Sequence, residues 1–149
     1  MTVFRRLLAL PRRDRLAILE AAALALVIEG GLRLLPFPTL MRLLGISMNL
    51  TRSSTPSGPP VWSHAELTWI RAVERLFRHW PLQGGCLRRS LLLGSGLKSR
   101  QPVLHIGVAR SGGSVEAHAW LDVGGIELAT ASPSRRFAAL RPAASPERE

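Results

Sequence analysis

Cysteine, tyrosine and lysine are almost missing from this sequence. Its 149 residues include one cysteine, Cys86, one lysine, Lys98, and no tyrosine. A single cysteine forms neither an internal disulfide nor a cysteine-rich zinc site, so the class of small secreted proteins held by disulfides is excluded. Hydrophobic residues make up 46% of the chain and the mean hydropathy is +0.14, which excludes a wholly disordered chain. The length corresponds to about one domain.

Acidic residues are also scarce. The chain has 20 basic and 10 acidic residues, a net charge of +10. Residues 1–100 carry 15 basic and 5 acidic residues, whereas residues 101–149 carry 5 of each, so the excess lies in the first hundred residues. We expect an acidic partner to meet that part. Nucleic acid is not expected as a partner, because no basic run exceeds two residues and there is no zinc-finger or RNP-like motif.

No apolar run is long enough to cross a membrane. The longest candidate, residues 16–28, would make a helix of about 20 Å against a hydrocarbon core of about 30 Å, and Glu20 interrupts it. It is also a poor signal peptide, because no small-x-small cleavage site follows it. We therefore expect a cytoplasmic protein with a buried N-terminal helix, and contact with a membrane surface is the alternative.

The pattern divides the chain into four parts. We expect a helical layer over residues 1–48 and a flexible linker, rich in Ser, Thr, Pro and Gly, over residues 49–60. The main unit is expected over residues 61–141 and a disordered tail over residues 142–149. The composition from Ala138 onward already predicts fraying.

The helical layer is expected to be a hairpin of two helices. Asp14 is the predicted cap of the first helix, which ends at Glu29, where Gly30 and Gly31 supply a stop. Residues 38–45 predict the second, because proline stands near its start and glycine at its end.

The main unit should open with an amphipathic helix. Ser63 and Glu66 form a capping box, and the helix should continue until Pro81. Its predicted core stripe is Trp69, Ile70, Val73, Leu76, Phe77 and Trp80. Its predicted solvent face is Arg71, Glu74, Arg75 and Arg78, with an ion pair between Glu74 and Arg78.

A second helix and three strands should follow. The helix begins at or near Cys86 and ends at the glycine-rich breaker 94–96. Residues 103–109 and 115–123 predict strands, the second with Val115, Ala117, Ala119, Leu121 and Val123 inward and Glu116, His118, Trp120 and Asp122 on the other face. Gly124-Gly125 predicts a hairpin turn into residues 126–131.

Cys86 and His118 are the candidate catalytic pair. Cys86 follows two glycines at a helix start, where free N–H groups and the helix dipole stabilise a thiolate, although a lone cysteine is more often a small buried hydrophobe. A cysteine on a helix packed against a histidine on a sheet is the arrangement of papain-like and transglutaminase-like cores. Among the other histidines, His64 and His79 should be solvated at helix ends, and a core or surface role is favoured for His105.

Several stretches together resemble one particular family. CLRRSLLL from Cys86, HIGVAR from His105 and EAHAWLDVGG from Glu116 are similar to the lasso peptide biosynthesis B2 proteins, the transglutaminase-like leader peptidases. The segment LLALPRRDRLAILEAAALALVIEGGLRLLPF is similar to the family's opening helices. The resemblance covers most of the chain outside residues 49–60 and the tail.

The resemblance implies an α+β fold with a papain/transglutaminase-like core and a cysteine protease that removes the leader from a lasso peptide precursor. Cys86 then matches the family's nucleophile and His118 its base. No metal or organic cofactor is implied. The implied partners are the precursor peptide, a separate leader-recognition protein and an ATP-dependent lasso cyclase. A scaffold without catalytic activity and a thioester-forming acyl transferase are the alternatives.

The third catalytic position departs from the family. An aspartate usually stands twelve residues after the histidine, and this chain has Thr130 there. A threonine hydroxyl accepts from the imidazole Nδ1–H but supplies no negative charge. A three-residue loop would pair His118 with Thr130, and a two-residue loop would leave Thr130 diagonal to it. Glu116 is the second choice, and a backbone carbonyl acting alone is the alternative.

Two further polar residues lie near this site in the sequence. Asp122 lies about 13 Å along the strand from His118, too far for its partner without a bulge. Gln83, three residues before Cys86, is the candidate side chain for an oxyanion hole.

Overall fold

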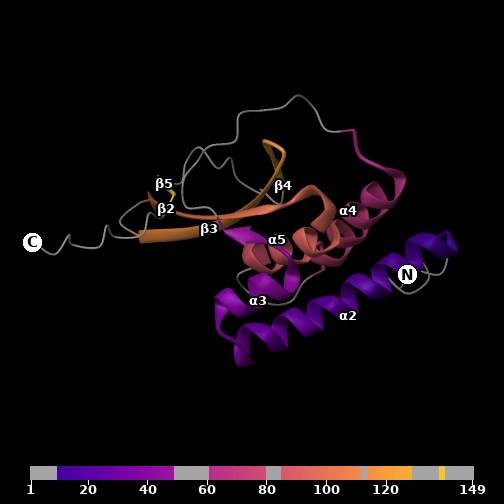
Figure 1. Ribbon diagram of the computed structural model, residues 1–149, viewed down its shortest axis with the longest axis horizontal. Coiled ribbons are helices and arrows are strands. Elements are labelled where there is room, and N and C mark those ends of the chain that lie inside the picture. The colour runs from indigo at the N-terminus through magenta and orange to yellow at the C-terminus, as the bar shows by residue number, and fades with distance from the viewer. Residues whose placement is uncertain (1–9, 49–60, 80–84, 112–113, 129–137, 140–149) are drawn as a thin grey trace, which may run out of the picture.

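Four helices lie on one side of a small mixed sheet in the computed structural model of the chain (Figure 1). The structure describes residues 10–48, 61–79, 85–111, 114–128 and 138–139. The helices are α2 (Arg12–Leu34), α3 (Phe37–Leu44), α4 (His64–Phe77) and α5 (Gly85–Gly96), followed by a short 3₁₀ turn, Lys98–Arg100. The strands are β1 (Ser47–Met48), β2 (Val103–Ser111), β3 (Ser114–Val123), β4 (Ile126–Leu128) and β5 (Ala138–Ala139). The predicted α+β class is confirmed.

Helix α5 is the centre of the packing. It contacts β2 and β3 on one side and α2, α3 and α4 on the other, so α2 forms the outermost layer, away from the sheet. One hydrophobic core runs from α2 to β3 and includes Ile28, Leu91 and Leu121. The residues of the N-terminal layer therefore share a core with the main unit.

Helix α2 differs from the prediction at both ends. It begins at Arg12 after Pro11, with no side-chain cap, and Asp14 lies inside its first turn. It continues through the glycine pair to Leu34 because Gly31 serves helix packing instead of termination. A Cβ at Gly31 would lie 2.7 Å from Leu40 Cδ1, so glycine lets α3 approach closely. The predicted cap and the predicted stop are both wrong.

Helix α3 follows the prediction, and its exit adds a strand that was not predicted. Pro38 lies in its first turn and Gly45 ends it with a φ of 66°. Helices α2 and α3 pack together as the predicted hairpin. Ser47 and Met48 then pair in parallel with the start of β2. A pairing of two residues with a strand more than fifty residues away leaves no local pattern in the sequence.

Helix α4 has the predicted capping box. Ser63 Oγ accepts from the N–H of Glu66 at 3.2 Å, and the Glu66 carboxylate accepts from the N–H of Ser63 at 2.7 Å. Arg100, in the turn after α5, adds an ion pair with a Nε–Oε1 distance of 2.7 Å. The hydrogen bond from Arg100, more than those from Ser63, lowers the pKa of Glu66 to about 2.

The core stripe of α4 is confirmed where it is described. Trp69 and Val73 are buried in the core, and Ile70, Leu76 and Phe77 pack against it. The helix ends at Phe77, and Trp80 lies outside the described residues.

The predicted solvent face of α4 is wrong for two of its four residues. Glu74 pairs with Arg89 of α5 instead of Arg78, and Arg75 pairs with Asp14 of α2 at 2.9 Å. These residues connect α4 to its neighbouring helices, while Arg71 and Arg78 are exposed. Contacts between distant elements decide which polar residues of a helix face water.

Helix α5 ends at Gly96, within the predicted glycine-rich segment 94–96, and its glycines also allow close packing. A Cβ at Gly94 would lie 2.7 Å from Ile46 Cδ1 and 3.2 Å from Leu121 Cδ1. A Cβ at Gly96 would lie 2.2 Å from the indole nitrogen of Trp69. Both glycines therefore allow neighbours to press against α5, which runs to Gly96.

Strands β2 and β3 form a regular antiparallel pair from Val103 opposite Asp122 to Ser111 opposite Ser114. Ala119, Leu121 and Val123 are buried as predicted, but Val115 and Ala117 are exposed, because the buried part of the strand begins at His118. From there both faces are covered: Leu121 lies in the core, and Trp120 on the opposite face is also buried.

The hairpin between β3 and β4 has the two-residue loop. Gly124 and Gly125 have φ values of 61° and 87°, which only glycine adopts easily in succession. Asp122 Oδ1 accepts from the N–H of Gly125 at 2.9 Å and holds the turn. The predicted turn is confirmed in its two-residue form, and of the predicted strand 126–131 the structure describes residues 126–128.

The C-terminal prediction is wrong at two residues. Ala138 and Ala139 form β5, which pairs antiparallel with Val108 and Gly107 of β2. The predicted linker 49–60 and the tail 142–149 lie outside the described residues. Within the described part of the chain, no helix has the length and apolar character needed to cross a bilayer.

Candidate active site

Cys86 lies in the first turn of α5, as the sequence predicted. The helix begins at Gly85, and the Cys86 side chain is half-buried against the hydrophobic core. The first backbone N–H groups of a helix have no partner inside it, and the helix dipole is positive at this end. The position suits a thiolate and, later in a reaction, an oxyanion.

Two consecutive arginines tie this turn to two different helices. Arg88 forms a forked ion pair with Glu29 of α2, with distances of 2.5 Å from Nε to Oε2 and 3.2 Å from Nη2 to Oε1. Arg89 turns to α4, where its Nε donates to Glu74 Oε1 at 3.1 Å. The turn that carries Cys86 is thus held on both sides.

Arg88 also acts on the cysteine electrostatically. Its pKa is raised chiefly by the hydrogen bond to Glu29, and the charge of a Cys86 thiolate contributes in the same direction. The interaction is mutual, so the guanidinium attracts the charged form of the nucleophile.

A hydrogen bond connects this part of α5 to the strand that carries His118. Ser90, one turn after Cys86, donates from its buried hydroxyl to the carbonyl of Ala119 at 3.4 Å. Ala119 is the neighbour of His118 in β3. Strand β4 pairs with residues 121–123 of β3 and so does not pair with Ala119. The helix that carries the cysteine and the strand that carries the histidine are therefore in contact.

His118 is held in a buried aromatic group. Its ring stacks against Trp120 with centroids 6.2 Å apart, and His105 stacks on the same indole at 5.5 Å. Burial lowers the pKa of His118. The imidazole is therefore neutral at neutral pH, which is the form that accepts a proton. Strand alternation places the His118 ring on the Trp120 face, whereas α5 packs on the opposite face of β3, where Ser90 bonds to Ala119 and Gly94 lies against Leu121.

The competing histidines behave as expected. His64 and His79 are exposed at the two ends of α4. His105 is buried, which decides between its two predicted environments in favour of the core.

The candidates for the supporting roles are described only in part. Thr130, the first choice for the third catalytic position, and Gln83, the candidate for the oxyanion hole, both lie outside the described residues. Glu116 is exposed on the same strand face as His118. Asp122 holds the hairpin turn, and β3 has no bulge that would bring it nearer to His118.

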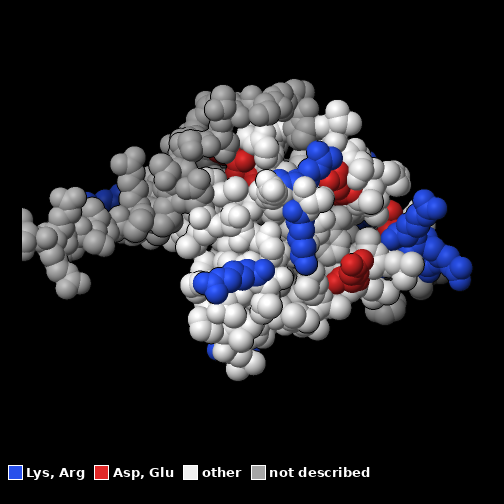
Figure 2. Space-filling model, viewed as in Figure 1, with Lys and Arg blue, Asp and Glu red and all other residues white. Residues whose placement is uncertain are grey.

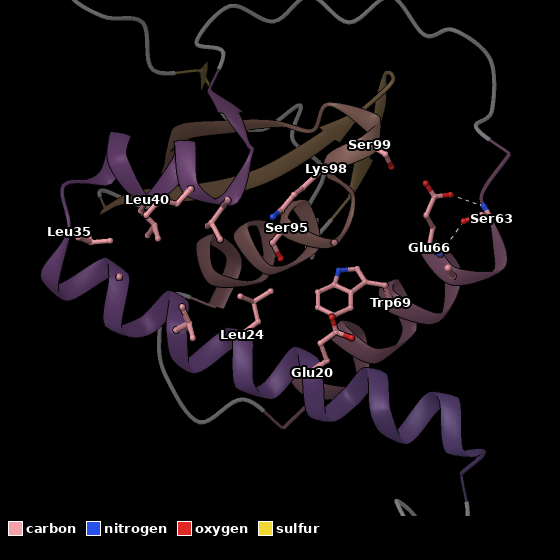
Figure 3. A pocket seen from close by; sticks show the side chains of 16 residues that line it. Glu20, Leu24, Leu35, Leu40, Ser63, Glu66, Trp69, Ser95, Lys98 and Ser99 are labelled. Atoms are coloured by element: carbon pink, nitrogen blue, oxygen red, sulfur yellow. Dashed lines mark hydrogen bonds between the residues drawn. The ribbon is translucent and has the colours of Figure 1, made fainter.

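A cavity of about 680 Å³ lies at the other end of α5 (Figure 3). Leu24 and Glu20 of α2, Leu40 of α3 and Trp69 of α4 line it, together with Ser95 near the end of α5. Ser95 lies nine residues after Cys86, about 13 Å along a helix axis. The cavity is separate from the candidate catalytic pair.

Glu29 and Glu74 are site residues that the sequence analysis missed. Their partners are 59 and 15 residues away in the chain. The only local indication of these carboxylates is the pair of arginines in the first turn of α5. The pair indicates that acidic partners are needed, but the sequence around it does not identify them.

Comparison with protein families decides the relationship of the chain. The profile of the transglutaminase-like superfamily matches residues 31–142, three quarters of the sequence, and this range includes Cys86 and His118. The chain belongs to the transglutaminase-like superfamily. No curated protein and no solved structure matches it significantly. The transglutaminase-like superfamily comprises cysteine peptidases and transglutaminases, so the fold found here is one that supports hydrolysis or acyl transfer.

Proposed function

We propose that this transglutaminase-like protein is a cysteine peptidase that removes the leader from a lasso peptide precursor. The observation that carries the proposal is the position of Cys86 in the first turn of α5. In the next turn of the same helix, Ser90 donates a hydrogen bond to the strand that carries His118. The similarity of CLRRS and AHAW to the lasso B2 proteins supports the choice of substrate.

The reaction needs only the two side chains and water. The neutral imidazole of His118 takes the thiol proton, and the Cys86 sulfur attacks the carbonyl carbon at the junction of leader and core. The C–N bond breaks, the imidazolium gives its proton to the leaving amine of the core, and the leader stays on Cys86 as a thioester. Water then attacks the thioester and gives its proton to His118. The C–S bond breaks, which releases the leader carboxylate and restores the thiol.

The proposed partners follow from the same resemblance. A separate leader-recognition protein delivers the precursor, and an ATP-dependent cyclase receives the core. The basic first hundred residues are the part of the chain that suits an acidic leader or partner.

The deciding experiment is mass spectrometry of a cognate precursor incubated with the protein and its recognition partner. Free leader and free core are expected from the parent, and uncleaved precursor from Cys86→Ala. Ser95→Ala, a change of similar size at the distant end of α5, is the matched control and should retain cleavage. Cleavage by Cys86→Ala would contradict the proposal.

The same experiment separates the two alternatives. Acyl transfer predicts that an added primary amine appears on the leader carbonyl in preference to water. A scaffold without catalytic activity predicts that the precursor binds to the parent and stays intact.

A further inference from the structure

Helix α2 has an apolar face that points away from the protein. Its inner face packs on α4 and α5. Figure 1 shows α2 as the outermost layer, on the side away from the sheet. Its outer face carries five large apolar side chains with exposed fractions between 63% and 83%: Leu16, Leu19, Leu26, Val27 and Leu34. At about 100° per residue these positions fall within a stripe about 100° wide. The stripe runs about 27 Å along the helix.

The apolar surface continues from α2 onto α3. Leu35, between the two helices, and Leu43 of α3 are also exposed, at 39% and 65%. Val27, Leu35 and Leu43 line the same cavity, so the exposed apolar side chains of the two helices are neighbours. We call the exposed side chains of α2, Leu35 and Leu43 the outer apolar face.

The charges around the outer apolar face are mostly positive. Arg12 and Arg13 are exposed at the start of α2, and Arg42 is exposed on α3. Arg33, near the end of α2, pairs with Glu29 and keeps most of its side chain in solvent. Glu20 is the exposed carboxylate on α2. Figure 2 shows a basic cluster at the N-terminal end of α2, and the helices below the sheet present mostly white surface with a few blue side chains and a red one on it.

We propose that the outer apolar face docks on an anionic lipid surface, with α2 lying in the plane of the interface. An apolar stripe flanked by arginines is the pattern of helices that lie at a membrane surface. The arginines favour anionic headgroups over a second copy of the chain, because a copy would bring positive charge against positive charge. Helix α2 is the outermost helix, so its whole length can lie against the flat lipid surface.

This docking keeps the strand of His118 away from the lipid. Helix α5 lies between α2 and the sheet, so the strand of His118 lies on the side of the molecule away from the lipid. The inference does not depend on the proposed peptidase activity, because it uses none of the catalytic residues.

The test is flotation of the full-length protein with vesicles of two compositions. Vesicles of phosphatidylcholine with one third phosphatidylglycerol are expected to bind at least about tenfold more tightly than pure phosphatidylcholine, because several arginines meet the charged headgroups. High salt should remove most of this difference. No binding to the anionic vesicles would overturn the proposal.

Matched variants locate the contact. Leu19→Glu combined with Leu26→Glu should abolish flotation, because both side chains would enter the apolar layer with a charge. Val115→Glu on β3 changes an equally exposed valine, at 66%, far from α2 and should bind as the parent does. Arg12→Gln with Arg13→Gln should weaken binding to the anionic vesicles alone. Circular dichroism confirms that each variant is folded.

Two results would assign the face to a different occupant and overturn the proposal. In the first, light scattering finds a dimer that the Leu19 and Leu26 variant dissociates, and no vesicles bind. In the second, the variant loses only its affinity for the leader-recognition protein.

Discussion

Arg88 and Glu29 join the turn of the candidate nucleophile to the outermost helix of the protein. Two hydrogen bonds of 2.5 and 3.2 Å form the pair, and both side chains are mostly buried. Charge-assisted forked pairs hold geometry as well as charge. The relationship makes α2, which carries no proposed catalytic group, part of the support of Cys86.

The first prediction separates the charge of Arg88 from its geometry. Arg88→Met should slow alkylation of Cys86 by iodoacetamide severalfold at constant pH, because the guanidinium no longer attracts the thiolate. Arg88→Lys keeps the charge and loses the forked geometry, so its alkylation should stay near that of the parent while leader removal falls. Arg33→Met, on the exposed partner of the same Glu29, is the control and should change neither rate. Equal alkylation in the parent and Arg88→Met would contradict the electrostatic role.

A second prediction concerns the pH dependence of the reaction. Burial lowers the pKa of His118 below its ordinary value of 6.5, so the neutral base persists into mildly acidic solution. The rate of leader removal should therefore stay level from pH 8 to the usual histidine range near 6.5 and fall only below it. His118→Ala should lose activity, and His79→Ala, at an exposed helix end, should keep the parent profile. A fall in rate centred above pH 6.5 would contradict the buried neutral base.

The third prediction uses the carboxylate of Glu66. Its pKa is about 2 in the folded protein against 4.5 as the reference value, so folding favours the charged form. Its contribution to stability is complete above pH 4.5 and is lost as the pH falls toward 2. The melting temperature of Glu66→Gln should therefore lie below that of the parent at pH 7 and approach it near pH 2.5. Glu116→Gln, at an exposed strand position, should match the parent throughout, and a constant difference for Glu66→Gln would point to a cause other than its charge.

Two glycines give opposite expectations for the same substitution. Gly30 has open space around its Cβ position, so Gly30→Ala should stabilise the protein by about 0.5–1 kcal/mol through helix propensity. At Gly96 the new methyl would overlap the buried Trp69 indole, and Gly96→Ala should destabilise by about 1–3 kcal/mol. Urea unfolding measures both. Stabilisation by Gly96→Ala would mean that Trp69 does not press on α5.

The sequence predicted what depends on neighbouring residues. Each correctly predicted feature depends on a few adjacent residues. The structure has the capping box of Ser63, the helix start at Cys86 and the turn at Gly124-Gly125. The errors lie where a distant element decides. Gly31 looks like a helix stop until Leu40 packs against it.

The candidate site shows the same division. Cys86 and His118 were found from their local settings and from the family resemblance. The acidic partners of Arg88 and Arg89 come from other helices, and nothing near either arginine in the chain indicates them. The direct contact between Cys86 and His118 stays a prediction, because the hydrogen bond of Ser90 joins α5 to the backbone of β3 and not to the imidazole.

The last prediction tests which group orients His118. If Thr130 holds the imidazole, Thr130→Asp should supply the missing negative charge, stabilise the imidazolium and raise the rate of leader removal. Loss of the orienting aspartate costs about four orders of magnitude in the serine-protease example, so even partial recovery would be visible. Thr130→Val, which has nearly the same shape without the hydroxyl, should lower the rate.

Glu116→Gln is the matched test of the second choice. A large loss with this variant, and none with either change at Thr130, would transfer the role to Glu116 on the same face of β3. Parent rates in all three variants would mean that a backbone carbonyl alone orients the ring. Each rate should be measured with the precursor in excess, since a change in substrate binding then leaves the turnover number unaffected.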